Sequence, residues 1–434
     1  MPGRYGADSA LVIVELLNTG SELMLGRVLN THQQWICRRL ADLGWPCTRQ
    51  TAVPDTGTAI RDATLEALQR ADWVITTGGL GPTSDDITRD YIAELLGRKL
   101  VLDEPVLENI RGFFASRKRP MPASVAIQAQ VPEGAIVLHN HHGTAPGLAL
   151  WVEPGRFRAE GSWLVMLPGP PRELRPMFDL QVVPLLKEWA PLSEPYRCLT
   201  LRTCGLGESW VEECLAPILP PLFARGLEIG YCARTGEVDI RLVARGVHAD
   251  PLVQEAELET IRLLGDHVFG RNDEQLEEIV VRLATAQGAR LVTAESCTGG
   301  YLAHRMTNVP GASAVLWGGW ITYDNDAKRQ ELGIPPAIIE EHGAVSEPCA
   351  QAMAEGALAR SSATHALAIT GIAGPSGGTE QKPVGTVFVA LAIRGLATRV
   401  RRFFNPFDRE TFKYVTSQQA LEMLRRSFLA PATT

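Results

Sequence analysis

Three apolar runs, far apart in the chain, each end in a glycine-rich loop. WVITT (73–77) leads into GGLGP, RLVTAES (290–296) into CTGG, and HALAIT (365–370) into GIAGPSGG. Such runs are typical of strands buried in a mostly parallel sheet, and ligands of these sheets bind at the carboxyl ends of the strands. Glycine also lets backbone N–H groups approach a phosphate closely. The pattern therefore predicts α/β domains that bind a phosphorylated ligand.

The order of the segments indicates three domains. A chain of 434 residues exceeds what a single hydrophobic core normally serves. Strand-like runs alternate with helical spacing in the first and last regions, whereas the middle region mixes a few strands with an amphipathic helix. We expect two α/β domains with mainly parallel or mixed sheets, at 1–178 and 272–434, joined by a small α+β domain at 182–270.

Some element predictions are specific enough to compare with a structure. The run ALVIVELL predicts a strand over 10–17, and 124–140 is expected to be strand-like. A helix over 30–44 is expected to stop at Gly44. The segment 310–328 is interpreted as a turn, a short apolar run and a polar loop.

The composition argues against several classes of protein. A hydrophobic content of 45% is enough for full cores, and a net charge of −7 does not suit a general nucleic-acid binder. The eight cysteines include no CxxC pair, so neither a zinc site nor a redox dithiol is expected. No apolar run reaches membrane-spanning length, and MPGRYGADSA has no signal-peptide pattern. We expect a cytoplasmic protein without a membrane partner.

The loop after the first run combines groups that suit a phosphate and a cation. Two carboxylates, Asp85 and Asp86, close the loop, and they repel a phosphate unless a cation lies between them. A hard divalent ion such as Mg²⁺ is therefore expected. The alternative is a tight turn in which one of the two acids caps the next helix. The expected ligand-binding residues are Thr77, Gly78, Gly79, Gly81 and Thr83.

The last region places a serine, a tyrosine and a lysine close together in sequence, at Ser313, Tyr323 and Lys328. A serine hydroxyl is a poor nucleophile until a base removes its proton. Lys328 could be that base if burial lowers its pKa from about 10.4 toward roughly 7–8. A cap, a half-buried aromatic side chain and a solvated lysine would give the same spacing.

Ordered motifs over almost the whole chain resemble one known family. ESCTGG, PGAS, TYDNDAK, GAVS, TGIAGPSGG and PVGTV resemble the amidohydrolase domain of the CinA family, also described as the PncC-type nicotinamide mononucleotide deamidase. GSELMLGRVLNT, TTGGLGPTSDDITRD, NHHGTAPG and LPGPPRE are similar to the N-terminal domain of that family, which is like the molybdopterin-binding proteins MoaB and MogA.

The resemblance implies an activity for the last domain. It would hydrolyse the amide of nicotinamide mononucleotide to nicotinate mononucleotide and ammonia without a cofactor. Ser313 would be the nucleophile and Lys328 the general base. The supporting residues implied are Tyr323, Ser296, Thr370 and Arg409, and the loop glycines expected at the substrate are Gly299, Gly300, Gly371 and Gly374.

The resemblance also implies that the first domain is an ADP-ribose pyrophosphatase in which Asp85 and Asp86 bind Mg²⁺ or Co²⁺. It implies a KH-like middle domain and a homodimer. Two positions depart from the family pattern. Ser21 stands where the family commonly has Asp, and His32 stands where it has Asn. If the missing carboxylate binds metal, the pyrophosphatase would be weak.

Three alternatives remain open at this point. Cys297 could be the nucleophile, because a thiol at a helix N-terminus has a lowered pKa. The first domain could serve molybdopterin binding, or the chain could be a non-catalytic competence or recombination factor. Nucleic-acid binding is not expected, because the GLGES loop of the middle domain is not a basic GXXG clamp.

Overall fold

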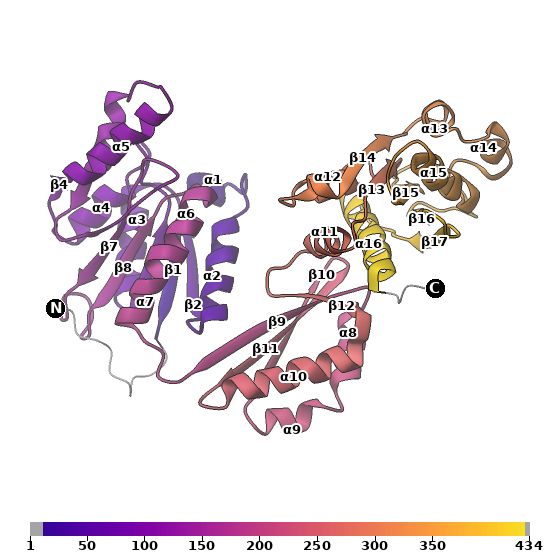
Figure 1. Cartoon of the computed structure of the whole chain (residues 1–434). Helices are drawn as coiled ribbons and strands as arrows, with labels where there is room; N and C mark the ends of the chain where they lie inside the picture. The colour runs from indigo at the N-terminus through magenta and orange to yellow at the C-terminus, as the bar shows by residue number, and fades with distance from the viewer. Residues whose placement is uncertain (1–11, 430–434) are drawn as a thin grey trace. The chain divides into compact units, whose positions relative to one another are not determined.

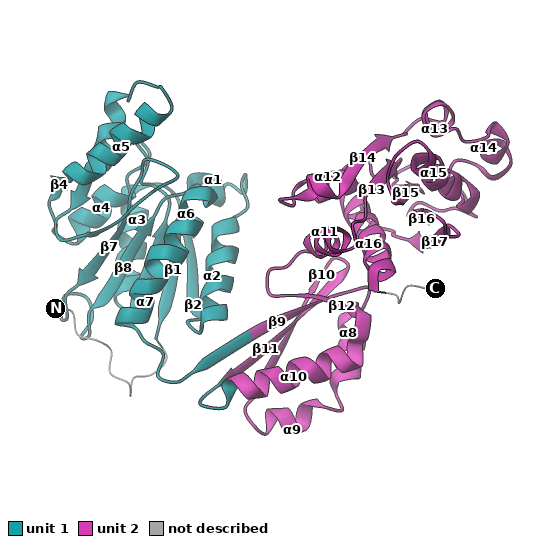
Figure 2. Ribbon diagram, viewed as in Figure 1, with its two compact units in different colours: residues 1–198, 245–249 teal, residues 199–244, 250–434 magenta. Residues whose placement is uncertain are grey.

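The computed structural model describes residues 12–429, which belong to two compact units (Figures 1 and 2). Unit 1 runs up to Cys198 and includes Arg245–Ala249, and unit 2 contains Leu199–Ala244 and the chain from Asp250 onward. The first two residues of the strand expected over 10–17, and the segment MPGRYGADSA, lie outside the described residues.

Unit 1 is an α/β sandwich. Its strands are β1 (Val14–Thr19), β2 (Cys47–Val53), β3 (Trp73–Thr77), β4 (Leu100–Leu102), β5 (Gln130–Pro132), β6 (Ile136–Leu138), β7 (Gly147–Val152) and β8 (Ser162–Leu167). Six of them form a sheet in the order β2-β1-β3-β8-β7-β6, and β4 pairs with β5. The strands β2, β1, β3 and β8 are parallel, whereas β7 and β6 are antiparallel to their neighbours.

Helices cover both faces of this sheet (Figure 1). They are α1 (Ser21–Met24), α2 (Thr31–Leu43), α3 (Gly57–Leu68), α4 (Thr88–Leu95), α5 (Glu104–Ser116), the 3₁₀ helix η1 (Ala123–Ala129), α6 (Pro171–Met177), the π-helix η2 (Phe178–Val182) and α7 (Val183–Trp189). Ile36 and Leu40 of α2 pack on one face with Phe178, and Ile60 of α3 and Ile92 of α4 pack on the other. Both faces of the parallel strands are therefore buried, as their apolar sequences require.

Three details differ from the sequence predictions. β1 lies later than expected, at Val14–Thr19. The segment expected to be strand-like begins with the helix η1, and its strands β5 and β6 are short. The stretch α6–η2–α7 continues to Trp189, past residue 178, where the first domain was expected to end. Gly44 stops α2 as expected, with φ +98°.

Unit 2 begins with a small α+β part. Its elements are β9 (Tyr196–Cys204), α8 (Glu208–Leu215), α9 (Leu219–Phe223), β10 (Glu228–Arg234), β11 (Glu237–Arg245), α10 (Ala249–Leu264), the 3₁₀ helix η3 (Gly265–His267) and β12 (Val268–Arg271). The four strands form a sheet in the order β10-β11-β9-β12. The pairs β10–β11 and β9–β12 are antiparallel.

The rest of unit 2 is a second α/β sandwich. Its strands are β13 (Leu291–Glu295), β14 (Leu316–Ile321), β15 (His365–Gly371), β16 (Thr386–Ile393) and β17 (Arg399–Phe404). Its helices are α11 (Leu276–Ala286), α12 (Tyr301–Thr307), the 3₁₀ helix η4 (Ala312–Ala314), α13 (Asn325–Leu332), α14 (Pro336–His342), α15 (Glu347–Ala359) and α16 (Arg409–Leu429). The sheet order is β14-β13-β15-β16-β17, with β14, β13 and β15 parallel.

Helices cover both faces of this sheet too. α15 packs on one face, and α11, α12 and α16 pack on the other. Ser346 caps α15 by accepting a hydrogen bond from the Cys349 amide, as a serine at a helix N-terminus should. Two α/β domains with mainly parallel or mixed sheets and a small α+β part between them confirm the predicted fold class.

Buried polar side chains join the two parts of unit 2. Glu237 of β11 accepts hydrogen bonds from Arg202 of β9, at 2.5 Å, and from Gln418 of α16. Gln418 in turn accepts from Arg305 of α12 at 2.7 Å. All four side chains are nearly inaccessible to solvent. The network connects α12 and α16 to the small sheet.

Within residues 12–429, no helix is long and apolar enough to cross a membrane.

Candidate functional site

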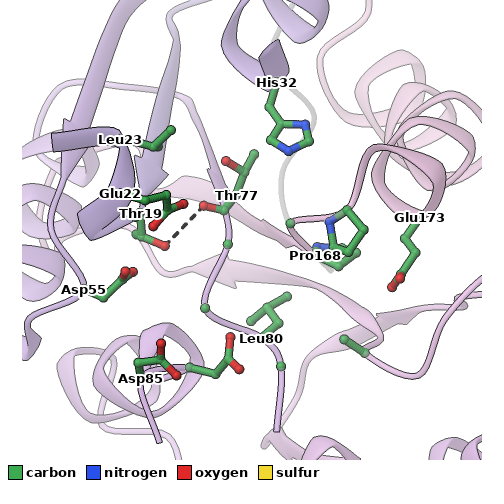
Figure 3. A pocket seen from close by; sticks show the side chains of 18 of the residues that line it. Thr19, Glu22, Leu23, His32, Asp55, Thr77, Leu80, Asp85, Pro168 and Glu173 are labelled. Atoms are coloured by element: carbon green, nitrogen blue, oxygen red, sulfur yellow. Dashed lines mark hydrogen bonds between the residues drawn. The ribbon is translucent and has the colours of Figure 1, made fainter. Parts of the chain in front are cut away.

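A cavity of ≈ 630 Å³ lies at the carboxyl ends of the parallel strands of unit 1 (Figure 3). Thr19 ends β1, Thr77 ends β3 and Pro168 follows β8, and all three line the cavity. The Thr19 hydroxyl donates a hydrogen bond to the Thr77 carbonyl at 3.2 Å. The chain runs from β1 to β2 on one side and returns to β3 on the other, so the cavity lies where the strand order reverses. α/β sheets bind their ligands at this position.

The loop after β3 has a backbone that only glycine fits without strain. Gly78 and Gly79 have φ values of +99° and +67°, and a Cβ on Gly79 would lie 2.0 Å from Thr88 Oγ1. The amides of Gly79, Leu80 and Gly81 donate no hydrogen bond to any of the residues 12–429. Three adjacent donors in a cavity wall are a suitable cradle for a phosphate.

The two acids of this loop bind Thr83 and do not cap the next helix. The Thr83 amide donates to Asp86 Oδ2 at 3.0 Å, and its hydroxyl lies 2.5 Å from carboxylate oxygens of Asp85 and Asp86. Helix α4 begins at Thr88, and Ile87, at its N-cap, makes no side-chain cap. The alternative that one acid serves only as a cap is therefore wrong. The Thr83 hydroxyl lowers the pKa of Asp85, which keeps this carboxylate ionised.

Further acids line the cavity that the sequence analysis did not single out. Asp55, which follows β2, and Glu22 of α1 lie with Asp85 on one side of the loop (Figure 3). Burial raises the pKa of Asp55, and the negative charges of Glu22 and Asp85 raise it further. Ser21 exchanges two hydrogen bonds with Asp55, at 2.8 and 3.1 Å. An aspartate at position 21 would have added a further carboxylate beside Asp55.

The acids suit a cation that keeps several water ligands better than one that is bound by protein side chains alone. Within residues 12–429, no group of three or more His, Cys, Asp or Glu side chains is arranged to hold a metal ion by itself. Mg²⁺ commonly keeps several waters and takes one or two carboxylates together with the phosphates of the substrate. Asp55, Asp85 and Asp86 fit that pattern, because they line the same cavity as the free amides.

Three other polar side chains reach the cavity from distant segments. Gln128 of η1 is only 2% exposed and donates from Nε2 to the Leu80 carbonyl at 3.2 Å. A carbonyl only accepts, so this bond fixes the amide orientation, and Gln128 Oε1 has no partner within residues 12–429. Glu173 is buried and accepts from Asn140 at 2.8 Å, and burial lowers the pKa of His32. Glu173 ends the motif LPGPPRE and His32 is one of the two departures from the family pattern, whereas no quoted motif contains Gln128.

In unit 2, Lys328 is the centre of a buried polar group. It lies on α13 and not in a polar loop as expected, and it is 1% exposed. Its ammonium donates to the Thr322 and Tyr323 carbonyls at 2.9 and 3.1 Å, and to Ser296 Oγ at 3.2 Å. No carboxylate in the described chain forms an ion pair with it. Burial lowers the pKa of Lys328, which favours the neutral amine that a general base requires.

Four other predicted residues of this site are Tyr323, Arg409, Thr370 and Gly371, and their contacts differ. Arg409, at the start of α16, donates to the Tyr323 hydroxyl at 2.6 Å and to the Gly374 carbonyl at 2.9 Å. Gly371 ends β15. The buried Thr370 donates from its hydroxyl to a backbone carbonyl at 2.7 Å. Tyr323 and Arg409 therefore connect the strand-end loops to the lysine.

Ser313, the nucleophile that the resemblance implies, makes no hydrogen bond to Lys328 within residues 12–429. It lies on η4 and is exposed. Its hydroxyl makes no hydrogen bond within residues 12–429. The hydroxyl that Lys328 contacts belongs to Ser296, which is 8% exposed.

A buried carboxylate occupies most of the amides of the second glycine-rich loop. Glu295, which is fully buried, accepts from the amides of Gly300, Leu302 and Ala303 at 2.9 to 3.0 Å. The Gly299 amide donates to a carbonyl of the same turn at 3.0 Å. The amides of Gly299 and Gly300 are thus engaged within the protein.

Two amides beside Ser296 differ from the rest of this loop. Those of Cys297 and Thr298 donate no hydrogen bond to another of the residues 12–429. The Cys297 thiol does not fit the alternative role of nucleophile, because burial raises its pKa to about 12. The thiol lies in the hydrophobic core, where the thiolate is not stabilised.

Comparison with known proteins agrees with this arrangement along the whole chain. Residues 15–188 match the model of a probable molybdopterin binding domain, 199–270 that of the damage-inducible protein CinA KH domain, and 273–428 that of the CinA C-terminal domain. The CinA-like protein of Akkermansia muciniphila is 45% identical over 410 residues, covering 94% of this chain and 95% of that protein. The CinA-like protein of Dictyoglomus turgidum is 41% identical over 419 residues, covering 96% and 99%.

Among solved structures, the competence/damage inducible protein CihA from Agrobacterium tumefaciens is 40% identical, with a TM-score of 0.35. The match covers 36% of this chain and 98% of that one. The identity to the full-length relatives and the three matched domains in order show that the chain belongs to the CinA family.

Proposed function

We propose that the C-terminal domain hydrolyses the amide of nicotinamide mononucleotide, giving nicotinate mononucleotide and ammonia. The observation that carries the proposal is the contact of 3.2 Å between Lys328 Nζ and Ser296 Oγ. A lysine with a lowered pKa, buried without an ion-pair partner and in contact with a hydroxyl, is a base positioned beside a nucleophile. The resemblance of the surrounding motifs to the nicotinamide mononucleotide deamidases supplies the substrate.

The proposed reaction uses Ser296 as the nucleophile. Neutral Lys328 takes the proton of the Ser296 hydroxyl while Ser296 Oγ bonds to the carboxamide carbon. The C–N bond then breaks, and the leaving ammonia takes the proton back from Lys328. Water hydrolyses the resulting ester in the same way, with Lys328 again as base, and this frees the carboxylate and Ser296.

The oxyanion of the two tetrahedral intermediates needs hydrogen-bond donors that are already in place. The amides of Cys297 and Thr298 donate to no other residue of the described chain and directly follow Ser296. The amides of Gly299 and Gly300 already donate to other groups of the protein, so we assign the oxyanion to the amides of Cys297 and Thr298. Tyr323, held by Arg409, would orient the substrate from the exposed side.

The choice between the two serines can be tested directly. We expect Ser296→Ala to abolish ammonia release from nicotinamide mononucleotide, and Ser313→Ala to lower it far less, because only Ser296 contacts the base. Loss of activity in Ser313→Ala, with Ser296→Ala still active, would restore the role that the family resemblance implies for Ser313. No ammonia release from the unmodified protein would defeat the proposal itself.

For the N-terminal domain we propose metal-dependent hydrolysis of ADP-ribose to AMP and ribose 5-phosphate. The supporting observation is that three free amides, at residues 79–81, and the carboxylates of Asp55, Asp85 and Asp86 line one cavity. The amides suit a phosphate, and the carboxylates suit the divalent ion, Mg²⁺ or Co²⁺, that would neutralise it. When bound, such an ion supplies charge neutralisation of the diphosphate.

This second activity has its own test. Release of AMP from ADP-ribose should require an added divalent ion and should fall in Asp85→Asn, while ammonia release stays unchanged. AMP release that is insensitive to chelator would contradict the proposal. Recovery of the protein with a bound pterin and without either activity would favour molybdopterin binding.

A further inference from the structure

Two motifs of the first domain have no role in the hydrolysis proposed above. They are NHHGTAPG, at 140–147, and LPGPPRE, at 167–173. Both line the cavity of unit 1, the first through Thr144 and Ala145 and the second through Glu173 and the prolines before it. The two motifs therefore form a part of the cavity wall to which no group of the substrate has been assigned.

This part of the wall is separate from the acids that suit the cation. Glu173 and Pro168 lie on one side of the loop that follows β3, and Asp55 and Asp85 lie on the other (Figure 3). The free amides of that loop suit the diphosphate. Because a carboxylate repels a phosphate, Glu173 suits a group that is attached to the diphosphate and not the diphosphate itself.

Glu173 is held in place by both motifs. It lies in the first turn of α6, and its amide donates to the Pro170 carbonyl at 2.9 Å. Asn140 Nδ2 donates to Glu173 Oε2 at 2.8 Å and to a backbone carbonyl of its own loop at 2.8 Å. A Cβ on Gly143 would lie 2.0 Å from Glu173 Oε2. The loop 140–147 therefore packs closely on one oxygen of the carboxylate, and glycine at position 143 leaves room for it.

The other oxygen of Glu173 lacks a hydrogen-bond donor. Within residues 12–429, Oε1 accepts no hydrogen bond, and it pairs only with Arg172 Nε at 3.9 Å, from a side chain that is 77% exposed. Glu173 itself is 7% exposed. A carboxylate can accept about four hydrogen bonds, and burial with few donors costs free energy. A ligand group that donates hydrogen bonds would supply what this carboxylate lacks.

The wall around Glu173 is poor in donors. Pro168, Pro170 and Pro171 line the cavity and have no amide hydrogen. Gln128 lines the same cavity, and its Oε1 has no donor within residues 12–429. A phosphate needs donors, so this wall disfavours a phosphate and favours a group with several O–H or N–H bonds.

We propose that Glu173 binds the vicinal hydroxyls of a ribose of the substrate. ADP-ribose carries a ribose on each side of its diphosphate, and both riboses have two adjacent hydroxyls that can donate to one carboxylate. Acidic side chains bind the ribose 2′-hydroxyl in this way in dinucleotide-binding α/β sheets. The choice of ligand rests on the hydrolysis of ADP-ribose proposed above.

The experiment is isothermal titration calorimetry of the full-length protein with Mg²⁺ and the two expected products. AMP is compared with 2′-deoxy-AMP, and ribose 5-phosphate with 2-deoxyribose 5-phosphate. We expect the wild type to bind the ribose member of at least one pair roughly tenfold more tightly, because the deoxy compound leaves a buried carboxylate without a donor. In Glu173→Gln, which can still accept from Asn140, this ratio should fall to about 1. The pair that responds identifies which ribose of ADP-ribose binds at Glu173.

Glu22→Gln is the matched control, because Glu22 is a carboxylate of the same cavity on the side of Asp55 (Figure 3). It should change the affinity for both members of a pair alike and keep their ratio. The proposal is overturned if the wild type binds neither ribose compound, has no preference in either pair, or keeps its preference in Glu173→Gln. Equal loss of the preference in Glu22→Gln would also overturn it, since the effect would then follow the charge of the cavity and not Glu173.

The result does not depend on turnover, because the probes are products. A protein that releases no AMP from ADP-ribose but prefers a ribose compound through Glu173 would defeat the proposed hydrolysis and retain the ribose site. A protein that releases AMP but shows no such preference would retain the hydrolysis and defeat the ribose site.

Discussion

Replacing Lys328 with methionine tests whether this lysine acts in catalysis or only stabilises the fold. Lys328 is 1% exposed, and its ammonium bonds two carbonyls and Ser296 Oγ but no carboxylate of residues 12–429. Methionine has a similar length and no charge, so it removes the base and also the cost of burying an unpaired charge. The carbonyls of Thr322 and Tyr323 lose a donor, at about 1 kcal/mol each. These effects oppose each other, and we expect the unfolding free energy to change by less than about 2 kcal/mol.

The effect on activity should be much larger. General base catalysis typically contributes about 10²–10⁴-fold, which corresponds to about 3–5 kcal/mol of transition-state stabilisation. We therefore expect kcat/KM for nicotinamide mononucleotide to fall by about 10²–10⁴-fold in Lys328→Met. The assay is ammonia release, with denaturant unfolding measured on the same preparation. Lys187→Met, at an exposed lysine of unit 1, is the control and should change neither quantity.

The pH dependence gives an independent check. Only neutral Lys328 acts as a base, so kcat/KM should rise with pH through its lowered pKa, and this limb should vanish in Lys328→Met. For stability, the unfolded chain binds the lysine proton at pH values between the lowered pKa and about 10.4, where the folded protein does not. The unfolding free energy of the wild type should therefore rise with pH across that window, by at most about 1.4 kcal/mol per pH unit. Near-wild-type activity of Lys328→Met, or an unchanged pH profile, would refute the reasoning.

Three further predictions follow from the same sites. Iodoacetamide at pH 8 should leave ammonia release unchanged, because burial keeps the Cys297 thiol protonated; inactivation with labelling at Cys297 would contradict this. Glu295→Gln should lower the unfolding free energy by about 2–4 kcal/mol in denaturant titrations, because an amide cannot accept all three N–H groups that the carboxylate accepts. Gly79→Ala should reduce AMP release from ADP-ribose and spare ammonia release, since its Cβ would collide with Thr88; equal loss of both would indicate general unfolding.

The fold class could be predicted from the sequence because its main signals are local. An apolar run bounded by glycine predicts a buried strand, whatever lies elsewhere in the chain. A mixed pattern of polar and apolar residues, such as the one around Lys328, is harder to assign to a helix or to a loop. Asp324, Asn325 and Asp326 read as a polar loop, yet Asp324 accepts from the Asp326 amide and caps α13. These polar residues form the start of helix α13, and the buried Lys328 lies on that helix.

The composition of each site could be predicted only in part. Asp55, Glu22, Gln128 and Glu173 reach the cavity of unit 1 from four different segments. Glu22 and Glu173 lie in the motifs GSELMLGRVLNT and LPGPPRE, whereas Asp55 and Gln128 lie in none of the quoted motifs. Which serine of unit 2 contacts Lys328 also depends on contacts between distant segments. Both candidate serines precede Lys328 in sequence, and only the packing of α13 against the strand end decides that Ser296 is the one in contact.

The two glycine-rich loops show why similar sequences need not bind ligands in the same way. After β3, the amides of residues 79–81 donate to no other described residue, and the acids of that loop bind Thr83. After β13, the buried Glu295 takes three amides that would otherwise face a ligand. A carboxylate inside the loop excludes an anion from those amides, so the second loop cannot be a phosphate cradle of the first kind. It leaves only the two amides beside Ser296, and a pair of donors next to a hydroxyl suits the single oxyanion of an acyl transfer better than a phosphate.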